Sequence, residues 1–303
     1  MTKKSIIPQR FILVTFTFFI SVLMYVDRAC IGAAKGSVSS EFGLNNIQWA
    51  WVMAAFTLGY ALLQTPSGKI ADKKGARIVM SSIITVWSVL TALTGAAWNF
   101  VSMIVIRFLF GAGEAGAFPT LSKVVYKWFP VKERGIIQGI NFSGSRIGGA
   151  VAYPIVVALI ALLGWRGSFF IFGAVGLLFA LAWWLYFRNT PEESRFVGEE
   201  ETKYIIKNRQ KDGSVKKAKL TFAKTLKSKN MLLAMVQYIG SNFTFYFTLT
   251  WMFPYLKEAM QSTGTAASFW AMAPLIGGAF GNWVSGILVD RIYKSGNLKL
   301  SRS

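Results

Sequence analysis

Residues 68–97 read GKIADKKGARIVMSSIITVWSVLTALTGAA, a short turn rich in basic residues followed by an uncharged apolar run. The hydrocarbon core of a bilayer is about 30 Å thick, and about 20 apolar helical residues cross it. Turns that hold basic residues beside such a run stay on the cytoplasmic side. The stretch therefore predicts a membrane-spanning helix that starts at the cytoplasmic face.

Apolar runs of similar length fill most of the remaining chain. There are seven of them: 11–31, 48–67, 100–121, 136–162, 167–187, 231–254 and 265–289. The first follows Lys3, Lys4 and Arg10, as the apolar core of a signal peptide does, but it is too long and no convincing small-residue cleavage site precedes the next run. We therefore expect an all-α integral membrane protein with eight spans.

The composition excludes an ordinary soluble enzyme. Of 303 residues, 53% are hydrophobic and only 15% are charged, whereas soluble domains carry roughly a quarter charged residues. The chain has no histidine and a single cysteine, Cys30. This removes Ser-His-Asp and Cys-His catalytic sets, intrachain disulfides and His/Cys metal sites. We expect no enzyme activity, no cofactor and no metal, so any proton transfer has to use carboxylates.

Basic residues alternate between the two sides of the predicted membrane. Five segments hold 27 Lys and Arg against 9 Asp and Glu: 1–10, 68–77, 122–135, 188–230 and 290–303. The connections on the other side hold only Lys35, Arg166 and Lys257 as basic residues. Both termini of this chain should therefore be cytoplasmic. The alternation argues against a nucleic-acid surface, whose basic residues would share one face, and favours contact with anionic lipid head groups.

The polar connection 188–230 divides the chain. We expect a six-helix N-terminal half at 1–187, a cytoplasmic loop at 188–230, and the first two helices of a second half at 231–303. Within the loop, glutamates precede lysines at helical spacings: Glu199, Glu200, Glu201, then Lys203, Lys207 and Lys211. This order favours a short amphipathic surface helix, with a solvated linker as the alternative.

The turn at 68–77 has a partial copy, GILVDR, at residues 286–291. Both copies read Gly-x-x-x-Asp-basic, and each follows the second span of its own half, as in carriers built from internal repeats. The glycine permits close helix approach, and the aspartate can cap a neighbouring helix end. We predict a gating loop rather than a substrate site, formed by Gly68, Asp72, Lys73, Gly75, Arg77, Gly286, Asp290 and Arg291.

Five ionisable residues fall inside the predicted spans: Asp27, Arg28, Arg107, Glu114 and Arg146. Each costs about 2.5 to 3.5 kcal/mol at a helix centre, so we expect them to face a polar interior or one another. A functional site is the leading interpretation, and ion pairs that only tie helices together are the alternative.

Helical geometry limits how these charges can meet. Arg107 and Glu114 lie two turns apart on one face, about 10 Å by helix rise, so they should not pair directly. Gly111 between them permits close packing of a neighbouring helix. Asp27 and Arg28 point about 100° apart, so one should face a central cavity and the other a neighbouring helix.

Several motifs resemble the anion:cation symporter family of the major facilitator superfamily. They are Tyr25-Val26-Asp27-Arg28, RFLFGAGEA at 107–115, Trp128-Phe129-Pro130 with Glu133-Arg134-Gly135, and TWMFPYL at 250–256. The turn at 68–77 is similar to the loop motif of the superfamily. The resemblance covers the whole chain and implies two six-helix halves. Four helices would then be missing after residue 291, so we expect a C-terminally truncated chain.

The resemblance assigns roles position by position. It makes Asp27 and Glu114 the proton-coupling carboxylates, Arg28 the arginine that binds anionic substrate, and Arg107 the fourth-span arginine that partners the carboxylates. Tyr25 and Tyr60 fall where hydroxyls contact sugar-acid oxygens, with packing between helices as the alternative. Arg146 matches no motif: it holds a second substrate carboxylate or forms an ion pair in the fifth span, and both readings stay open.

The function implied is proton-coupled uptake of an organic anion, such as a sugar acid of the galactonate, glucarate or hexuronate class, by alternating access. The planar fork of arginine suits a carboxylate, and protonation of a neighbouring carboxylate frees that fork for substrate. We expect a monomer in the inner membrane, with Na⁺ not excluded as the coupling ion. The alternatives are a carrier of another substrate class and a truncated membrane fragment that does not transport.

Overall fold

The computed structural model describes residues 8–209, 226–259, 261 and 264–295. In this part of the chain the regular structure is helical and contains no strand. The main helices are α1 (Gln9–Ala33), α2 (Lys35–Phe42), α3 (Asn46–Lys74), α4 (Ala76–Gly95), α5 (Phe100–Glu114), α6 (Ala117–Trp128), α7 (Arg134–Tyr186), α8 (Glu199–Asn208), α10 (Lys229–Ala259) and α11 (Gly264–Lys294). The short 3₁₀ turns η1 (Val131–Glu133) and η2 (Pro191–Glu193) complete the fold.

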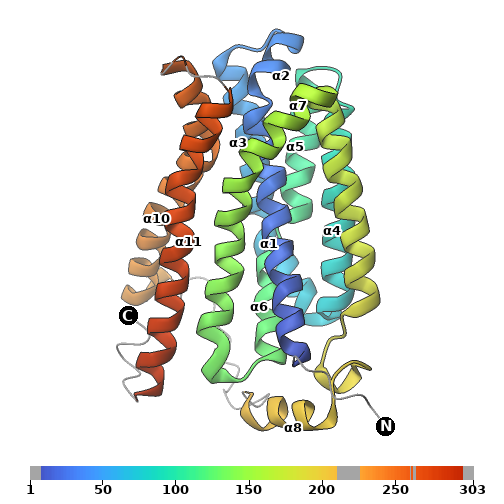
Figure 1. Cartoon of the computed structure of the whole chain (residues 1–303), viewed down its shortest axis with the longest axis vertical. Coiled ribbons are helices and arrows are strands. Elements are labelled where there is room, and N and C mark those ends of the chain that lie inside the picture. The colour runs from blue at the N-terminus through green and yellow to red at the C-terminus, as the bar shows by residue number, and fades with distance from the viewer. Residues whose placement is uncertain (1–7, 210–225, 260, 262–263, 296–303) are drawn as a thin grey trace.

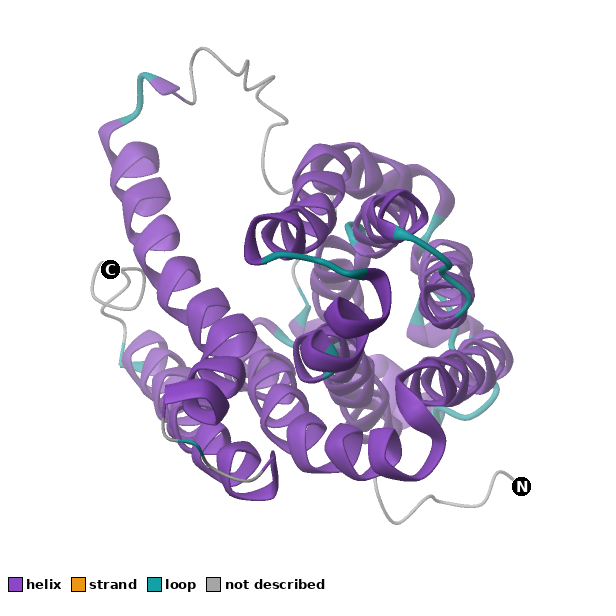
Figure 2. Ribbon diagram, turned by 90° about the horizontal axis from the view of Figure 1, so that it is seen from above, coloured by secondary structure: helices purple, strands orange, loops and turns teal. Residues whose placement is uncertain are grey.

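The long helices run roughly side by side in one bundle (Figures 1 and 2). α7 packs against α1, α4 and α11, and α3 packs against α5. α2 and α8 lie at opposite ends of the bundle, which we call the α2 end and the α8 end (Figure 1). The all-α fold expected from the apolar runs is confirmed.

Within the residues that the structure describes, five segments are long and apolar enough to cross a membrane: Gln9–Ala33, Ala76–Gly95, Phe100–Trp128, Val131–Tyr186 and Thr265–Lys294. Val131–Tyr186 contains two of the expected spans, 136–162 and 167–187. These are separated at Gly164, whose φ of 71° and ψ of 169° interrupt the helical path of α7. The other two expected spans lie in α3 and α10, helices of 29 and 31 residues that carry more polar side chains.

One local expectation needs correction. The connection expected at 32–47 contains the helix α2, which ends at Gly43 in the left-handed conformation that glycine adopts without strain. The span expected at 100–121 lies within the segment Phe100–Trp128, which is made of α5 and α6. Ala115 and Gly116 join these two helices with right-handed backbone angles.

Local sequence signals explain where several helices begin. Asn45 and Gln48 form a reciprocal capping box at the start of α3, and Asn99 and Ser102 form another at the start of α5. Gly75 separates α3 from α4 with a φ of 83°, a backbone conformation that residues other than glycine rarely adopt.

The close packing of α3 against α5 depends on glycines of both helices. A Cβ atom on Gly111 would collide with the carbonyl oxygen of Phe56, and one on Gly59 would collide with that of Phe108. The two backbones therefore touch, which fixes α5 and its charged residues relative to α3.

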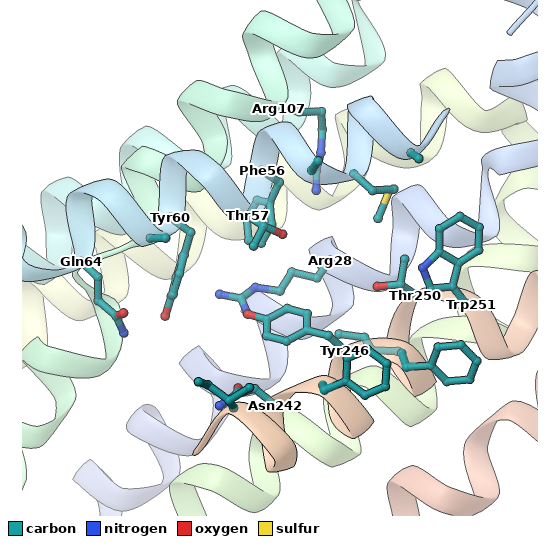
Figure 3. Close-up of a pocket in the computed structure, with 18 of the residues that line it drawn as sticks. Arg28, Phe56, Thr57, Tyr60, Gln64, Arg107, Asn242, Tyr246, Thr250 and Trp251 are labelled. Atoms are coloured by element: carbon teal, nitrogen blue, oxygen red, sulfur yellow. The ribbon is translucent and has the colours of Figure 1, made fainter. Parts of the chain in front are cut away.

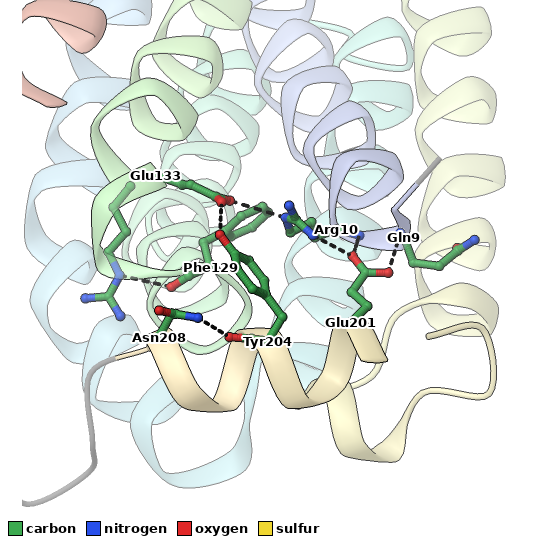
Figure 4. Close-up of polar contacts among 8 residues, drawn as sticks. Gln9, Arg10, Phe129, Glu133, Glu201, Tyr204 and Asn208 are labelled. Carbon is green, nitrogen blue, oxygen red and sulfur yellow. Dashed lines mark hydrogen bonds and ion pairs between the residues drawn. The ribbon is translucent and has the colours of Figure 1, made fainter. Parts of the chain in front are cut away.

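The polar connection contains the predicted amphipathic helix, α8, which lies across the end of the bundle (Figure 4). The carboxylate of Glu201 accepts hydrogen bonds from the backbone N–H groups of Gln9 (2.9 Å) and Arg10 (3.1 Å), so α8 caps the start of α1. Arg10 also pairs with Glu133 at 3.2 Å, and the Tyr204 hydroxyl donates to Glu133 at 2.9 Å. The helix prediction is thus confirmed for 199–208, while Lys211 lies outside the described residues.

Candidate functional site

A buried ion pair joins α1 to α5. Nε of Arg28 donates to both carboxylate oxygens of Glu114, at 3.0 and 3.3 Å, and Nη2 lies 2.9 Å from Oε1. The two side chains are only 3% and 0% exposed. Because the ion pair is desolvated, removing one partner would leave an uncompensated buried charge. The structure therefore joins two of the five charges that the sequence places within spans.

Aromatic side chains surround the Arg28 guanidinium. Its carbon lies 4.6 Å from the ring centre of Tyr25, 4.7 Å from that of Tyr60 and 4.9 Å from that of Phe56. Nη1 donates to the Tyr246 hydroxyl at 2.9 Å. Aromatic faces stabilise a cation when water is excluded. Arg28 is consequently held as a charged group within an apolar bundle.

Arg107 lies beside this ion pair without joining it. Its guanidinium carbon stacks over the rings of Phe110 at 4.8 Å and Phe56 at 5.0 Å. It interacts electrostatically with Glu114 and Asp27, yet among the described residues no carboxylate lies within ion-pair distance. Its buried Nε has no hydrogen-bond partner. The separation from Glu114 agrees with the two-turn spacing on α5.

Asp27 points away from its neighbour Arg28. It is buried and faces Thr91 of α4, whereas Arg28 faces α3, α5 and α10. The 100° step between adjacent helical residues accounts for this divergence. The two acidic residues therefore occupy different surroundings: Glu114 is paired with an arginine, and Asp27 sits between helices.

Arg28 lines a cavity of about 630 Å³ between α1, α3 and α10, which we call the Arg28 cavity (Figure 3). Tyr60 and Arg107 also line it, as do polar groups that the sequence analysis did not identify: Thr57, Gln64, Asn242, Tyr246 and Thr250. The regular spacing of polar residues in the sequence of α10 could have predicted some of these cavity-lining groups. Tyr238, Asn242, Tyr246 and Thr250 recur every fourth residue, so they share one face of α10.

Arg146 occupies a separate position on α7. Its guanidinium carbon lies 3.8 Å from the ring centre of Phe245, and Gly278 of α11 lies beside it. It is not among the residues that line the Arg28 cavity. In the described part of the chain no carboxylate forms an ion pair with Arg146, so the structure gives no support to the ion-pair reading of this residue.

The second copy of the repeated motif caps a helix. The carboxylate of Asp290, at the end of α11, accepts from the backbone N–H groups of Gly135 (3.1 Å) and Ile136 (2.8 Å) at the start of α7. A Cβ atom on Gly286 would lie 3.0 Å from the Gly135 carbonyl oxygen. The helix approach and the cap are those that the motif's chemistry suggests.

The first copy of the repeated motif, at residues 68–77, makes different contacts from the second. Asp72 has a side chain that is 79% exposed and lies 3.6 Å from Lys123. Arg77 instead ties α4 to the end of α7: its guanidinium donates to the Trp184 carbonyl at 2.9 and 3.1 Å. Its backbone N–H also donates to the Asn189 side chain at 2.9 Å. Within the described residues Asp72 therefore does not cap a helix.

Nothing in the described part of the chain points to a metal centre. No group of three or more His, Cys, Asp or Glu side chains is placed to hold an ion there. The site contains instead two buried arginines, two buried carboxylates and several hydroxyl and amide groups. This arrangement can bind an anion and exchange a proton with a carboxylate.

The sequence matches the family model described as Major Facilitator Superfamily over residues 17–301. It is 34% identical over 99% of its length to a probable sulfoacetate transporter of Cupriavidus necator, covering 69% of that protein. It is 31% identical over 92% of its length to a probable L-galactonate transporter of Escherichia coli, covering 61% of it, and 30% identical over 97% to a hexuronate transporter of Bacillus subtilis, covering 67%. The chain thus spans about two thirds of the length of these relatives.

Solved structures share the fold. A bacterial homologue of the human lysosomal transporter Spinster, in an inward-facing and unoccupied conformation, superposes with a TM-score of 0.72 at 23% identity, over 95% of this chain and 64% of that one. A D-xylose-proton symporter gives a TM-score of 0.59 at 15% identity, over 94% of this chain and 69% of that one.

Proposed function

This chain belongs to the major facilitator superfamily, and from that premise we propose that it serves proton-coupled uptake of an organic anion such as a sugar acid. The superfamily and the similar proteins are transporters, and the chain is not an enzyme. It is a multi-pass membrane protein. We place it in the inner membrane as a monomer, with both termini of this chain cytoplasmic as the charge pattern predicts, and with the α8 end at the cytoplasmic face because the described basic connections 68–77 and 122–135 lie at that end (Figure 1).

The observation that carries this proposal is the desolvated pair of Arg28 and Glu114 beside a cavity. The guanidinium fork is the group suited to a substrate carboxylate, but Glu114 occupies it. Protonation of Glu114 would neutralise the internal partner and release the fork for substrate. Anion and proton would then load together, which is the thermodynamic coupling that a symporter needs.

The other candidate site residues have the following roles in this proposal. Asp27 is the second proton acceptor, Arg107 adjusts the charge around both carboxylates, and Tyr25 and Tyr60 contact substrate oxygens. The six-helix half 1–187 and the second half, which begins with the two helices of 231–303, are joined by 188–230 and rock about the site so that it opens to one face at a time. The glycines and charges of the two loop motifs act in this motion and not in substrate binding.

Uptake by cells that express the gene tests the proposal. Accumulation of labelled galactonate, glucarate, a hexuronate or sulfoacetate is expected, and a protonophore should abolish it. Replacing Na⁺ by K⁺ should leave uptake unchanged, and loss of uptake in that arm would assign the coupling to Na⁺ instead. The absence of uptake for every organic anion, together with transport of a neutral or cationic solute, would refute the proposed substrate class.

A further inference from the structure

A second cavity lies at the α2 end of the bundle. Its volume is about 420 Å³, and its walls come from the end of α1, from α2, from the start of α3 and from the end of α10. The polar and charged side chains that line it are those of Lys35, Ser39, Asn46, Lys257 and Glu258. Within the described residues it shares none of its lining with the Arg28 cavity. We call it the Lys35 pocket, and its size is typical of a site for a small molecule.

The charges of the Lys35 pocket do not cancel. The connections opposite the cytoplasmic segments hold three basic residues, Lys35, Arg166 and Lys257, and two of the three line this pocket. Arg166 pairs with Glu41 at 2.6 Å, and Lys35 pairs with Glu258 at 3.0 Å. In the part of the chain that the structure describes, Lys257 has no carboxylate within ion-pair distance. The pocket therefore carries an excess of positive charge, which attracts anions.

Two uncharged donors accompany the lysines. The Ser39 hydroxyl is buried and has no hydrogen-bond partner among the described residues, and Asn46 lines the same pocket. A buried hydroxyl without a partner is uncommon, because it loses its hydrogen bonds to water without replacement. The oxygens of a carboxylate accept hydrogen bonds from hydroxyl, amide and ammonium groups. The lining therefore suits an oxyanion.

Trp251 of α10 connects the Lys35 pocket with the Arg28 cavity. The ammonium nitrogen of Lys35 is 5.9 Å from the centre of the Trp251 ring. The same tryptophan lines the Arg28 cavity, at the opposite end from Gln64 (Figure 3). An anion released from Lys35 would therefore pass this aromatic side chain to reach Arg28.

We propose that the Lys35 pocket binds the organic anion as it arrives from outside, and that the acidic group of the anion replaces Glu258 on Lys35. This inference rests on the proposed function and orientation and deepens them, because it gives the transported anion a first site before Arg28. The Glu258 side chain is 69% exposed, so its ion pair with Lys35 is weak and easily exchanged. A lysine ammonium lacks the planar fork of Arg28, so it holds a carboxylate less firmly and passes it on. The same exchange releases α2 from α10, the two helices that this ion pair joins.

Two variants that both break the ion pair between Lys35 and Glu258 give the central test. Uptake into right-side-out vesicles is measured with labelled galactonate, or with another of the anions named above if only that one accumulates. Lys35→Gln removes the cation that holds the anion, so the apparent KM should rise by about two- to fivefold, as for loss of an exposed charge contact. Glu258→Gln removes the competing carboxylate, so the KM should fall. If the ion pair served only to join α2 to α10, both variants would shift the KM in the same direction, and that result would overturn the inference.

Lys257→Gln tests the excess charge and leaves the ion pair intact. The KM should again rise by about two- to fivefold at low ionic strength, and the difference should shrink at high salt, because salt screens exposed charges. Lys132→Gln is the matched control, since this exposed lysine lies in η1 at the α8 end and its loss should leave the KM at the outer face unchanged.

The outcomes separate this inference from the proposed function. Equal KM values for Lys257→Gln and Lys132→Gln, in a protein that accumulates the anion, would overturn the inference and leave the proposed function standing. Absence of organic-anion uptake by the unmodified protein would refute both.

Discussion

The donor nitrogens of Arg28 are divided between two partners. Nε and Nη2 face Glu114, and Nη1 donates to the Tyr246 hydroxyl. A lysine ammonium carries its three donors on one nitrogen, so it cannot direct two coplanar nitrogens at one carboxylate as Nε and Nη2 do. The geometry of this residue, and not only its charge, is therefore adapted to carboxylate.

We predict that Arg28→Lys abolishes stabilisation of the protein by sugar acids. Substrate at a hundred times its dissociation constant raises the stability of the unmodified protein by about 2.7 kcal/mol, and this increment should vanish in the variant. A thermal-shift assay with and without substrate measures it. Tyr246→Phe is the control, since it removes one acceptor and should retain most of the shift. An equal shift in Arg28→Lys would show that the arginine is not the anion site.

Glu114→Gln should separate coupling from binding. Glutamine imitates the protonated carboxyl, so the Arg28 fork stays available while no proton can be exchanged. We expect the variant to lose accumulation against a gradient and to keep exchange of external for internal substrate. Glu199→Gln serves as control because that side chain is 92% exposed and lies far along the chain from the ion pair of Arg28 and Glu114. Uphill accumulation by Glu114→Gln would exclude Glu114 as the coupling residue.

At the scale of single elements, α8 contributes a cap to another helix. Glu201→Gln removes the charge that accepts from the first N–H groups of α1 and that pairs with Arg10. Loss of a cap costs about 0.5 to 2 kcal/mol, so the melting temperature should fall by a few degrees. Glu199→Gln is the control on the same helix, because its ion pair with Lys203 is almost fully exposed. Equal melting temperatures for the two variants would contradict the capping role.

The link between α2 and α7 should be sensitive to acid. Hydrogen bonds donated by Arg166 and Trp165 hold the pKa of Glu41 below the ordinary value of a glutamate. A carboxyl with a lowered pKa stabilises the fold fully above its unfolded pKa and loses this effect as the pH falls toward the folded value. Because Glu41 is 44% exposed, the contribution is screened to less than about 1 kcal/mol.

We therefore expect unfolding temperatures at pH 6 and pH 4 to differ less in Glu41→Gln than in the unmodified protein. The comparison uses differential scanning fluorimetry at both pH values. A pH dependence of the same size in both proteins would show that Glu41 does not contribute to it.

The helices could be predicted because the features that define them lie within short stretches of the sequence. The candidate site could be predicted only in part, because it combines residues from distant stretches. Apolar runs located every long helix because a bilayer demands about 20 such residues, and the glutamate-lysine order located α8. The pairing of Arg28 with Glu114 depends on the register of α1 against α5, which no local pattern contains. Tyr246 was missed for the same reason, since its role arises where α10 meets α1. The interruption at Gly164 gave no signal beyond a glycine among many.

At the scale of the molecule, two contacts join early helices to late ones at opposite ends of the bundle. Asp290 of α11 caps α7 at the α8 end, and Lys35 of α2 pairs with Glu258 of α10 at 3.0 Å at the α2 end. The alternating access that we propose would require these contacts to break in turn. The capped pair is the stronger, because it satisfies two backbone donors in a partly buried place.

We predict that Asp290→Asn increases opening at the α8 end. In a Cys30→Ser background, Asn242→Cys places a thiol in the Arg28 cavity, and an impermeant maleimide in inside-out vesicles measures access from that end. The rate of modification should rise several-fold with Asp290→Asn. Glu258→Gln should instead raise the rate in right-side-out vesicles. Unchanged rates in both vesicle types would show that neither contact controls opening.

The cap that Glu201 provides for α1 has a consequence for synthesis. Gln9 leaves the ribosome 192 residues before Glu201 exists, an interval on the order of ten to forty seconds at ordinary translation rates. The first helix must therefore enter the membrane with its leading amides uncapped by their final partner. The connection 188–230, made after the first six spans, then supplies the cap for the start of a helix that was made at the beginning of the chain. Translation order thus means that α1 gains the stabilisation of this cap, about 0.5 to 2 kcal/mol, only after α8 has been made.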